Sequence, residues 1–277
     1  MKKVLNILLA FVAFTSGVGA YHFTEVQDFT VDFVSQFEEE KVELSASVIK
    51  EEFVQKEQEM HSVAQVELEK KKYERDGLTI DLPESFDAIA REVLSSIPES
   101  QTRSLTRIIG EHGKDAKRGL ASFKSMYIGI DNIETDEEFR RVFIHELGHI
   151  LDLGGLKASS RKIDSGFRDG SNVIYNTDAS LDFYTLCWDT EHDLSGQCSD
   201  LDFVSEYAQA DSFEDFAESY LLFVENNESF VEMAKESEVL QKKYNFFAET
   251  VFNGKFENTA KAELPKEDRV WDLTKVY

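Results

Sequence analysis

The stretch FRRVFIHELGHILDLGG, Phe139 to Gly155, carries two histidines four residues apart and a glutamate between them. Residues four apart lie on the same face of an α-helix, so His145 and His149 can direct both imidazoles at a single ion. Glu146 lies beside them, where it misses the ion but reaches a water molecule next to it. This HExxH spacing predicts a zinc site with Glu146 as the general base. The alternative is a pair of core histidines whose ring nitrogens are satisfied by hydrogen bonds.

Signals on both sides of this stretch predict where its helix begins and ends. Thr135 and Glu138 have the spacing of a capping box, and Gly154 and Gly155 supply a stop. A strand is predicted just ahead of the helix in SMYIGID, and another in SLTRIIGEHG. Helical periodicity dominates in ESFDAIAREVLSSIP, FEDFAESYLLFVENN and ESFVEMAKESEVLQKKYNFFAETVF. The sequence therefore predicts an α+β protein in which helices dominate.

A catalytic zinc site needs a third protein ligand and one open coordination position. A histidine six residues after the HELGH motif would be one solution, but that position is a glycine. The segment EDFAES, on a second predicted helix that Ser212 would cap, offers Glu214, Asp215 and Glu218. Glu214 and Glu218 share one helix face, so one can bind the ion while the other hydrogen-bonds a ligand histidine. Spacing alone does not rank these two glutamates, and His192 in a polar loop is a weaker candidate.

The motif HELGHILD followed by FVSEYAQADSFEDFAESY resembles the catalytic domain of anthrax lethal factor and the secreted Pro-Pro endopeptidases. In that family a tyrosine precedes the ligand glutamate by seven residues, and a second glutamate follows the ligand by four. Tyr207, Glu214 and Glu218 reproduce this spacing. The resemblance implies that Glu214 is the third zinc ligand, Tyr207 is catalytic, and Glu218 supports a ligand through a hydrogen bond. The sequence departs from the family at Asp215, where an aromatic residue is common, and in a loop that carries two cysteines.

The resemblance also implies a fold and a reaction. The fold is a zincin-like metallopeptidase domain over residues 78–257, with a small sheet, an active-site helix and a glutamate helix. The reaction is hydrolysis of a peptide or protein substrate by water that one zinc ion activates, with Glu146 as the base. The strand SMYIGID would present an edge on which an extended substrate pairs. Asp152 is either a hydrogen-bonding partner of a zinc ligand or only an acid at the end of the helix.

The first twenty residues have the layout of a secretory signal. Lys2 and Lys3 precede an apolar run from Val4 to Phe14, and small residues follow up to Ala20. We expect cleavage after Ala20, although an uncleaved membrane anchor is the alternative. The protein is therefore predicted to be exported, as a secreted, periplasmic or cell-surface protein.

Export bears on the two cysteines, Cys187 and Cys198, which lie within residues 156–202. This region is rich in Gly, Ser and Asp and is predicted to consist of loops around one apolar stretch. Outside the cytoplasm we expect the two cysteines to form a disulfide, which would stabilise the protein by about 3 kcal/mol. The alternative is two free thiols.

Two further regions flank the predicted catalytic domain. Residues 21–77 are predicted to be an acidic helical region, and residues 258–277 a loose polar tail. The helical region has apolar residues at alternating spacings of four and three, interrupted at Lys56: Val42, Ala46, Ile49, Phe53, Met60 and Val63. This stripe predicts either a helix folded back on the domain or a stalk that self-associates as a coiled coil.

Composition narrows the class of function. The chain is 42% hydrophobic with 22 phenylalanines, which is enough for a folded core, and its formal net charge is −24. Such a charge repels nucleic acid, so we expect no nucleic-acid partner. The sequence thus predicts an exported zinc metalloendopeptidase. The alternative is a catalytically inactive exported interaction protein with a structural or vestigial zinc site.

Overall fold

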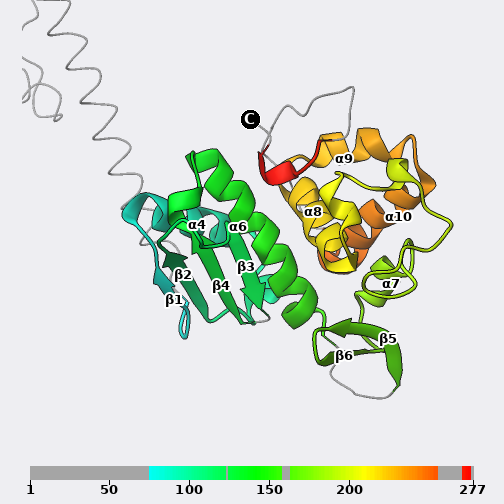
Figure 1. The fold of residues 1–277 in the computed structure, drawn as a ribbon, viewed down its shortest axis with the longest axis horizontal. Coiled ribbons are helices and arrows are strands. Elements are labelled where there is room, and N and C mark those ends of the chain that lie inside the picture. Colours follow the sequence, from blue (N-terminus) through cyan, green and yellow to red (C-terminus); the bar gives the residue numbers. More distant parts are fainter. Residues whose placement is uncertain (1–74, 123, 158–162, 255–269, 276–277) are drawn as a thin grey trace, which may run out of the picture. The chain divides into compact units, whose positions relative to one another are not determined.

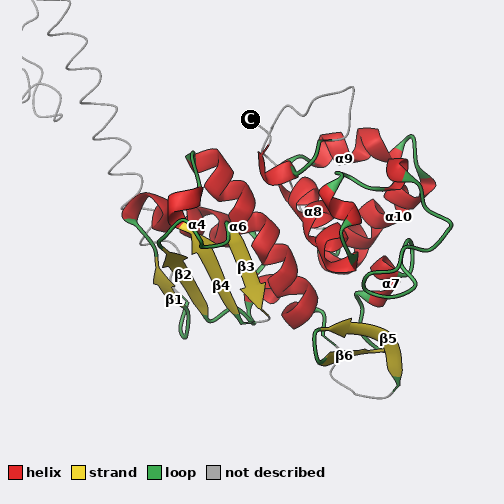
Figure 2. Cartoon of the chain, viewed as in Figure 1, coloured by secondary structure: helices red, strands yellow, loops and turns green. Residues whose placement is uncertain are grey.

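The computed structural model describes four stretches of the chain, residues 75–122, 124–157, 163–254 and 270–275. The predicted signal and the apolar stripe of the N-terminal helical region lie outside the described residues, so both stay predictions. In the part of the chain that is described, we find no helix that combines the length and the apolar character needed to span a membrane. Helices and strands are mixed (Figures 1 and 2), which confirms the α+β class.

A four-stranded sheet forms the N-terminal part of the described chain (Figure 1). Its strands are, in spatial order, β1 (Thr79–Asp81), β2 (Arg107–Glu111), β4 (Ser125–Gly129) and β3 (Gly119–Ser122). β1, β2 and β4 are parallel, and β3 is antiparallel to β4. Ile108 of β2 and Met126 and Ile128 of β4 are fully buried, as expected for central strands. The strands predicted in SLTRIIGEHG and SMYIGID are therefore confirmed as β2 and β4.

The outer strands of this sheet are β1 and β3, so the prediction that SMYIGID presents a free edge is wrong. β4 pairs with β2 on one side and with β3 on the other along its whole length. The sequence of β3, GLAS, has small residues and resembles a turn. It forms a strand because Ser122 pairs with Ser125 and Gly119 pairs with Ile128, which a local pattern does not reveal.

The HELGH motif lies on α6 (Asp136–Ile150), which packs against β3 and β4 with α4 (Glu84–Ser96) beside it. The side chain of Thr135 accepts the N–H of Glu138 at 3.1 Å, which confirms Thr135 as the N-cap. The carboxylate of Glu138 accepts the N–H of Glu134, one residue before the position used in a capping box. The start of α6 was therefore predicted correctly.

The helical run ends at Gly155, where the two glycines predicted a stop. Its last residues, Leu151–Gly155, form a π-helical turn. The N–H of Leu156 bonds to the carbonyl of Leu151 at 2.8 Å, and neither glycine has a positive φ. The helix thus ends without the left-handed glycine that usually terminates one.

The remaining helices and strands follow the active-site helix, apart from one short helix before it (Figure 2). They are α5 (Glu99–Thr102), β5 (Asp164–Asp169), β6 (Asn172–Tyr175), α7 (Leu181–Tyr184), α8 (Ser212–Glu225), α9 (Asn227–Ala234) and α10 (Glu238–Asn245). α7 lies in the apolar stretch that was predicted between loops, whereas the strands of the hairpin β5–β6 lie where loops were predicted. Their sequences are short and rich in turn-forming residues, so the pairing within the hairpin decides their structure.

The glutamate-bearing helix is α8, and its cap differs from the prediction by one residue. The carboxylate of Asp211 accepts the N–H groups of Phe213 and Glu214 at 2.9 and 2.8 Å, so Asp211 is the N-cap. Ser212 is instead the first residue of the helix. Both residue types cap helices well, and a carboxylate that satisfies two N–H groups is favoured at this position.

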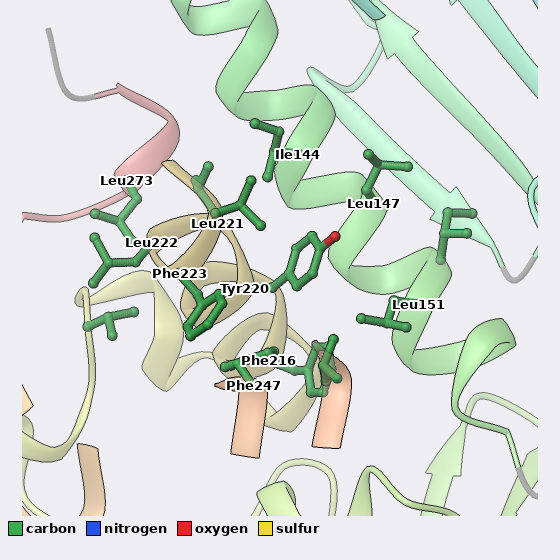
Figure 3. Packing of buried hydrophobic residues seen from close by; sticks show 14 of the residues in the cluster. Ile144, Leu147, Leu151, Phe216, Tyr220, Leu221, Leu222, Phe223, Phe247 and Leu273 are labelled. Atoms are coloured by element: carbon green, nitrogen blue, oxygen red, sulfur yellow. The ribbon is translucent and has the colours of Figure 1, made fainter. Parts of the chain in front are cut away.

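Helices α6 and α8 cross closely enough to share one core. A Cβ atom at Gly148 would lie 2.9 Å from Cα of Ala217, so the two backbones meet where α6 has no side chain. Figure 3 shows the apolar side chains around this crossing, among them Ile144 and Leu147 of α6 and Tyr220 of α8. This close approach brings the acidic residues of α8 to the histidines of α6.

The cysteine pair and the C-terminal residues are both fixed in the fold. Cys187 and Cys198 form a disulfide with their Cα atoms 5.5 Å apart, which confirms the predicted bond. Residues 270–275 pack against the domain, and both Leu273 and Thr274 are buried. The prediction of a loose polar tail is therefore wrong for these six residues. Their contacts come from residues distant in sequence, which a local reading of polarity does not detect.

Candidate metal centre

Three predicted ligands converge at the crossing of α6 and α8. One nitrogen each from His145 and His149 and one oxygen from Glu214 all lie within 4.8 Å of one another. Oε2 of Glu214 is 3.1 Å from Nε2 of His145 and 3.5 Å from Nε2 of His149. Ligands about 2 Å from a tetrahedral ion lie about 3.3 Å from one another, so these spacings fit a shared ion.

The chemistry of the group also fits a metal ion. Oε2 of Glu214 is buried and has no hydrogen-bond partner in the described structure, because neither nearby imidazole meets it in hydrogen-bonding geometry. A buried carboxylate oxygen without a partner is costly, and a cation at this position removes that cost. Two imidazole nitrogens and one carboxylate oxygen form a donor set that suits a divalent transition metal. The group could therefore hold a metal ion.

The short distances between the three ligand side chains shift their pKa values. Burial opposes charge on the imidazole of His145, but the carboxylates of Glu214 and Glu218 outweigh burial and raise the pKa well above its usual value. Burial likewise opposes charge on His149, and Glu214 raises the pKa of that ring. Burial favours the neutral form of Glu214, yet the two imidazoles outweigh it and lower the pKa of its carboxyl. The carboxylates thus make the site attractive to a cation.

Glu218 lies behind the ligands and is fully buried. Its Oε1 is 2.9 Å from Nδ1 of His145, the ring nitrogen that faces away from Glu214. Its Oε2 accepts hydrogen bonds from the hydroxyl of Ser205 at 2.7 Å and from the N–H of Leu273 at 2.9 Å. The structure thus ranks the two glutamates that spacing left unranked, with Glu214 at the ligand group and Glu218 orienting His145.

Glu146 is buried beside the ligand group, and its Oε2 has no hydrogen-bond partner in the described part of the chain. Burial raises the pKa of its carboxyl, although the imidazoles of His149 and His145 act in the opposite direction. A raised pKa suits a group that must take up a proton near neutral pH. Gly119, at the start of β3, forms one wall around this side chain.

The substitution Gly119→Ala tests whether the position of Glu146 matters for activity. A Cβ atom there would lie 2.7 Å from Cδ of Glu146, so Gly119→Ala must displace the carboxylate of Glu146. A misplacement of about 1 Å lowers the rate of catalysis by about 100-fold, so a comparable loss of any Glu146-dependent activity is expected. Zinc content and thermal stability should change little, because a flexible side chain absorbs the clash. Turnover and zinc content measured together check this, and unchanged turnover would contradict the assignment of Gly119.

Tyr207 lies on a 3₁₀ turn, η4 (Tyr207–Gln209), beside the ligands. Its ring centroid is 6.2 Å from that of His145, and its side chain lies close enough to Glu214 for the carboxylate to affect its pKa. Burial and the neighbouring charge of Glu214 raise the pKa of Tyr207, so its hydroxyl stays protonated and can donate a hydrogen bond. The predicted tyrosine is therefore within reach of whatever the metal group binds.

Three other candidates lie away from the ligand group. Asp152 is buried and accepts a hydrogen bond from the hydroxyl of Tyr184, and burial raises its pKa to about 7. Among the described residues, no hydrogen bond joins Asp152 to a ligand histidine. Asp215 points into the core, where it pairs with the buried ammonium of Lys243 at 2.7 Å. His192 is exposed and does not belong to the ligand group.

Four residues at the site have no counterpart in the sequence-based prediction. They are Arg118, Gly119, Ser205 and Leu273, which act through burial or through hydrogen bonds rather than through a motif. None of the four carried a local signal, because Gly119 lies in a segment of small residues that resembles a turn.

Comparison with known proteins adds no relative. No protein-family model, no curated protein and no solved structure matches this chain.

Proposed function

We propose that this protein is an exported zinc metalloendopeptidase with a zincin-like domain, related in its chemistry to anthrax lethal factor and the Pro-Pro endopeptidases. The observation that carries the proposal is the convergence of His145, His149 and Glu214, with Glu146 next to His145 in the chain and Tyr207 near the ring of His145. The motif spacing and the arrangement of a small sheet, α6 and α8 support it. A pair of hydrogen-bonded core histidines would not leave the buried Oε2 of Glu214 without a partner.

In this proposal each side chain has one task. A zinc ion, when bound, supplies Lewis-acid activation of water and of the scissile carbonyl. Glu146 accepts a proton at its unpartnered Oε2 from the attacking water and passes it to the leaving amine. The Tyr207 hydroxyl donates a hydrogen bond to the oxygen on which negative charge develops. Glu218 holds the ring of His145 in orientation through Nδ1.

The substrate would bind along β3. This strand is the outer strand on its side of the sheet and begins at Gly119, against Glu146, so a peptide added to its edge would pass beside the general base. Pairing of an extended peptide with an edge strand uses backbone hydrogen bonds and requires no particular side chains. Leu120 of β3 is 46% exposed and is available to contact such a peptide. This route replaces the one that the sequence predicted along SMYIGID.

The proposed setting is outside the cytoplasm. The Cys187–Cys198 disulfide suits an oxidising compartment, in agreement with the signal-like first twenty residues. The net charge of −24 disfavours nucleic acid as a partner, and the family resemblance implies a peptide or protein substrate.

The test of the proposal combines metal analysis with cleavage. The exported form is expected to contain one zinc per chain and to cleave members of a diverse peptide pool, with cleavage lost on chelation and restored by added zinc. Zinc without any cleavage would favour the inactive interaction protein with a structural site. Absence of zinc from protein purified without chelators would contradict both functions.

A further inference from the structure

Residues Val270–Lys275, here called the C-terminal strap, contact the catalytic tyrosine segment through the backbone. The N–H of Tyr207 donates to the carbonyl of Trp271 at 2.7 Å, and the N–H of Glu206 donates to the carbonyl of Val270 at 3.0 Å. Tyr207 itself lies on a short 3₁₀ turn, which has few hydrogen bonds of its own to hold it. The strap therefore supplies part of the backbone support of Tyr207.

The C-terminal strap also contacts the carboxylate of Glu218, which lies behind the ligand group. The N–H of Leu273 donates to Oε2 of Glu218, while Oε1 of Glu218 faces Nδ1 of His145. The Leu273 side chain is buried in the apolar cluster that Figure 3 shows, so this N–H is anchored in the core. Only Ser205 and Leu273 donate to Oε2 of Glu218 within the described residues. Loss of the Leu273 N–H would leave this buried oxygen with one partner.

A third set of contacts connects the strap to the wall of the general base. Arg118 pairs with Asp272 at 3.1 Å and donates to the hydroxyl of Thr274, and its Nε lies 3.0 Å from the carboxylate of Glu138 on α6. Arg118 directly precedes Gly119, the residue that packs against Glu146. The short helix η6 (Leu273–Lys275) lies against both α6 and α8 (Figure 1, red).

We infer that the C-terminal strap is a positioning element of the metal centre, which holds Tyr207 and Glu218 in place for catalysis and for metal binding. The inference rests on the proposed function, because Tyr207 and Glu218 have these tasks only in a metallopeptidase. It extends the site by a segment 55 residues beyond Glu218, with Leu273 as its central positioning residue. The proposed peptidase activity therefore requires an intact C-terminal strap.

Leu273 allows the backbone contact to be separated from packing. Leu273→Pro removes the N–H that donates to Glu218, and proline is tolerated in the first residue of a helical turn, which Leu273 occupies. Leu273→Ala removes most of the side chain but keeps the N–H, so it is the matched control. Lys275→Ala, at an exposed residue of the same strap, controls for any change in this segment.

The measurements are zinc affinity by competition with a chelator, the absorption spectrum of the cobalt-substituted protein, and kcat and KM on a peptide that the wild-type protein cleaves. Leu273→Pro should lower zinc affinity by about 10-fold relative to Leu273→Ala, at the low end of the loss that follows removal of a metal ligand's own hydrogen-bonding partner, because this N–H acts on His145 through Glu218. It should also alter the cobalt spectrum and lower kcat more than it raises KM. Lys275→Ala should match the wild type in all three.

Equal zinc affinity, spectrum and kcat in Leu273→Pro and Leu273→Ala would overturn the inference while leaving the proposed function intact. A wild-type protein that binds zinc but cleaves nothing would overturn the proposed function, and the effect of the strap on zinc affinity would still be measured. If Leu273→Pro does not fold, a second pair of variants tests the contact between the strap and Arg118. Arg118→Met removes the charge that pairs with Asp272, and Arg118→Lys keeps it. Both are compared by the same metal measurements. Equal results in that pair would likewise count against the inference.

Discussion

Glu146→Gln should retain zinc and lose turnover by about 10³- to 10⁴-fold, the upper range for removal of a positioned general base. Glutamine keeps the size of the side chain but does not take up the proton that the attacking water must lose. Glu146 does not belong to the ligand group formed by His145, His149 and Glu214, so the metal should remain. Zinc content and turnover on a responsive peptide, measured on the same preparation, check the prediction.

Tyr207→Phe is the comparison for this variant, because it also removes one functional group beside the metal. One donor to a developing oxyanion contributes about 3 kcal/mol, so its loss should lower kcat by about 100-fold, less than the loss in Glu146→Gln. A Glu146→Gln protein that cleaves at the wild-type rate would exclude Glu146 as the base. Loss of zinc from Glu146→Gln would place this residue among the ligands instead.

Glu214→Gln should weaken zinc binding by more than about 100-fold, a larger effect than loss of an outer hydrogen-bonding partner produces. The substitution removes the negative charge from the one carboxylate that lies 3.1 and 3.5 Å from the two ligand imidazoles. Turnover should fall with zinc occupancy and recover in part at high zinc concentration. Competition with a chelator of known affinity gives the change directly.

Glu218→Gln is the matched control for this prediction, since the two glutamates lie one turn apart on α8. Its carboxylate contacts Nδ1 of His145 from behind and does not itself belong to the ligand group, so zinc affinity should fall by about 10–100-fold. If Glu218→Gln weakened zinc binding more than Glu214→Gln, the two assignments would have to be exchanged.

The local features of the site could be predicted because they depend on helix geometry. A spacing of four places His145 and His149 on one face of any α-helix, and the cap at Thr135 is a contact between residues three apart. The disulfide was predictable because the chain has two cysteines and therefore one intramolecular pairing.

The features that were missed depend on contacts between distant segments. Asp152 bonds to Tyr184, which lies 32 residues away. The buried ion pair of Asp215 and Lys243 likewise joins two helices, which explains why Asp215 is not a ligand. No short window of sequence contains both partners of such contacts.

The sequence by itself determined the residue types of the proposed chemistry: two imidazoles and a carboxylate for a metal, and a glutamate beside them. Only the tertiary structure decided that Glu214 joins the histidines and that Glu218 stands behind His145, because this follows from the close crossing of α6 and α8 at Gly148. It also decided that residues 270–275 support the site. Helix periodicity acts within a few residues and can be read directly, whereas burial and long-range hydrogen bonds exist only once the chain has folded.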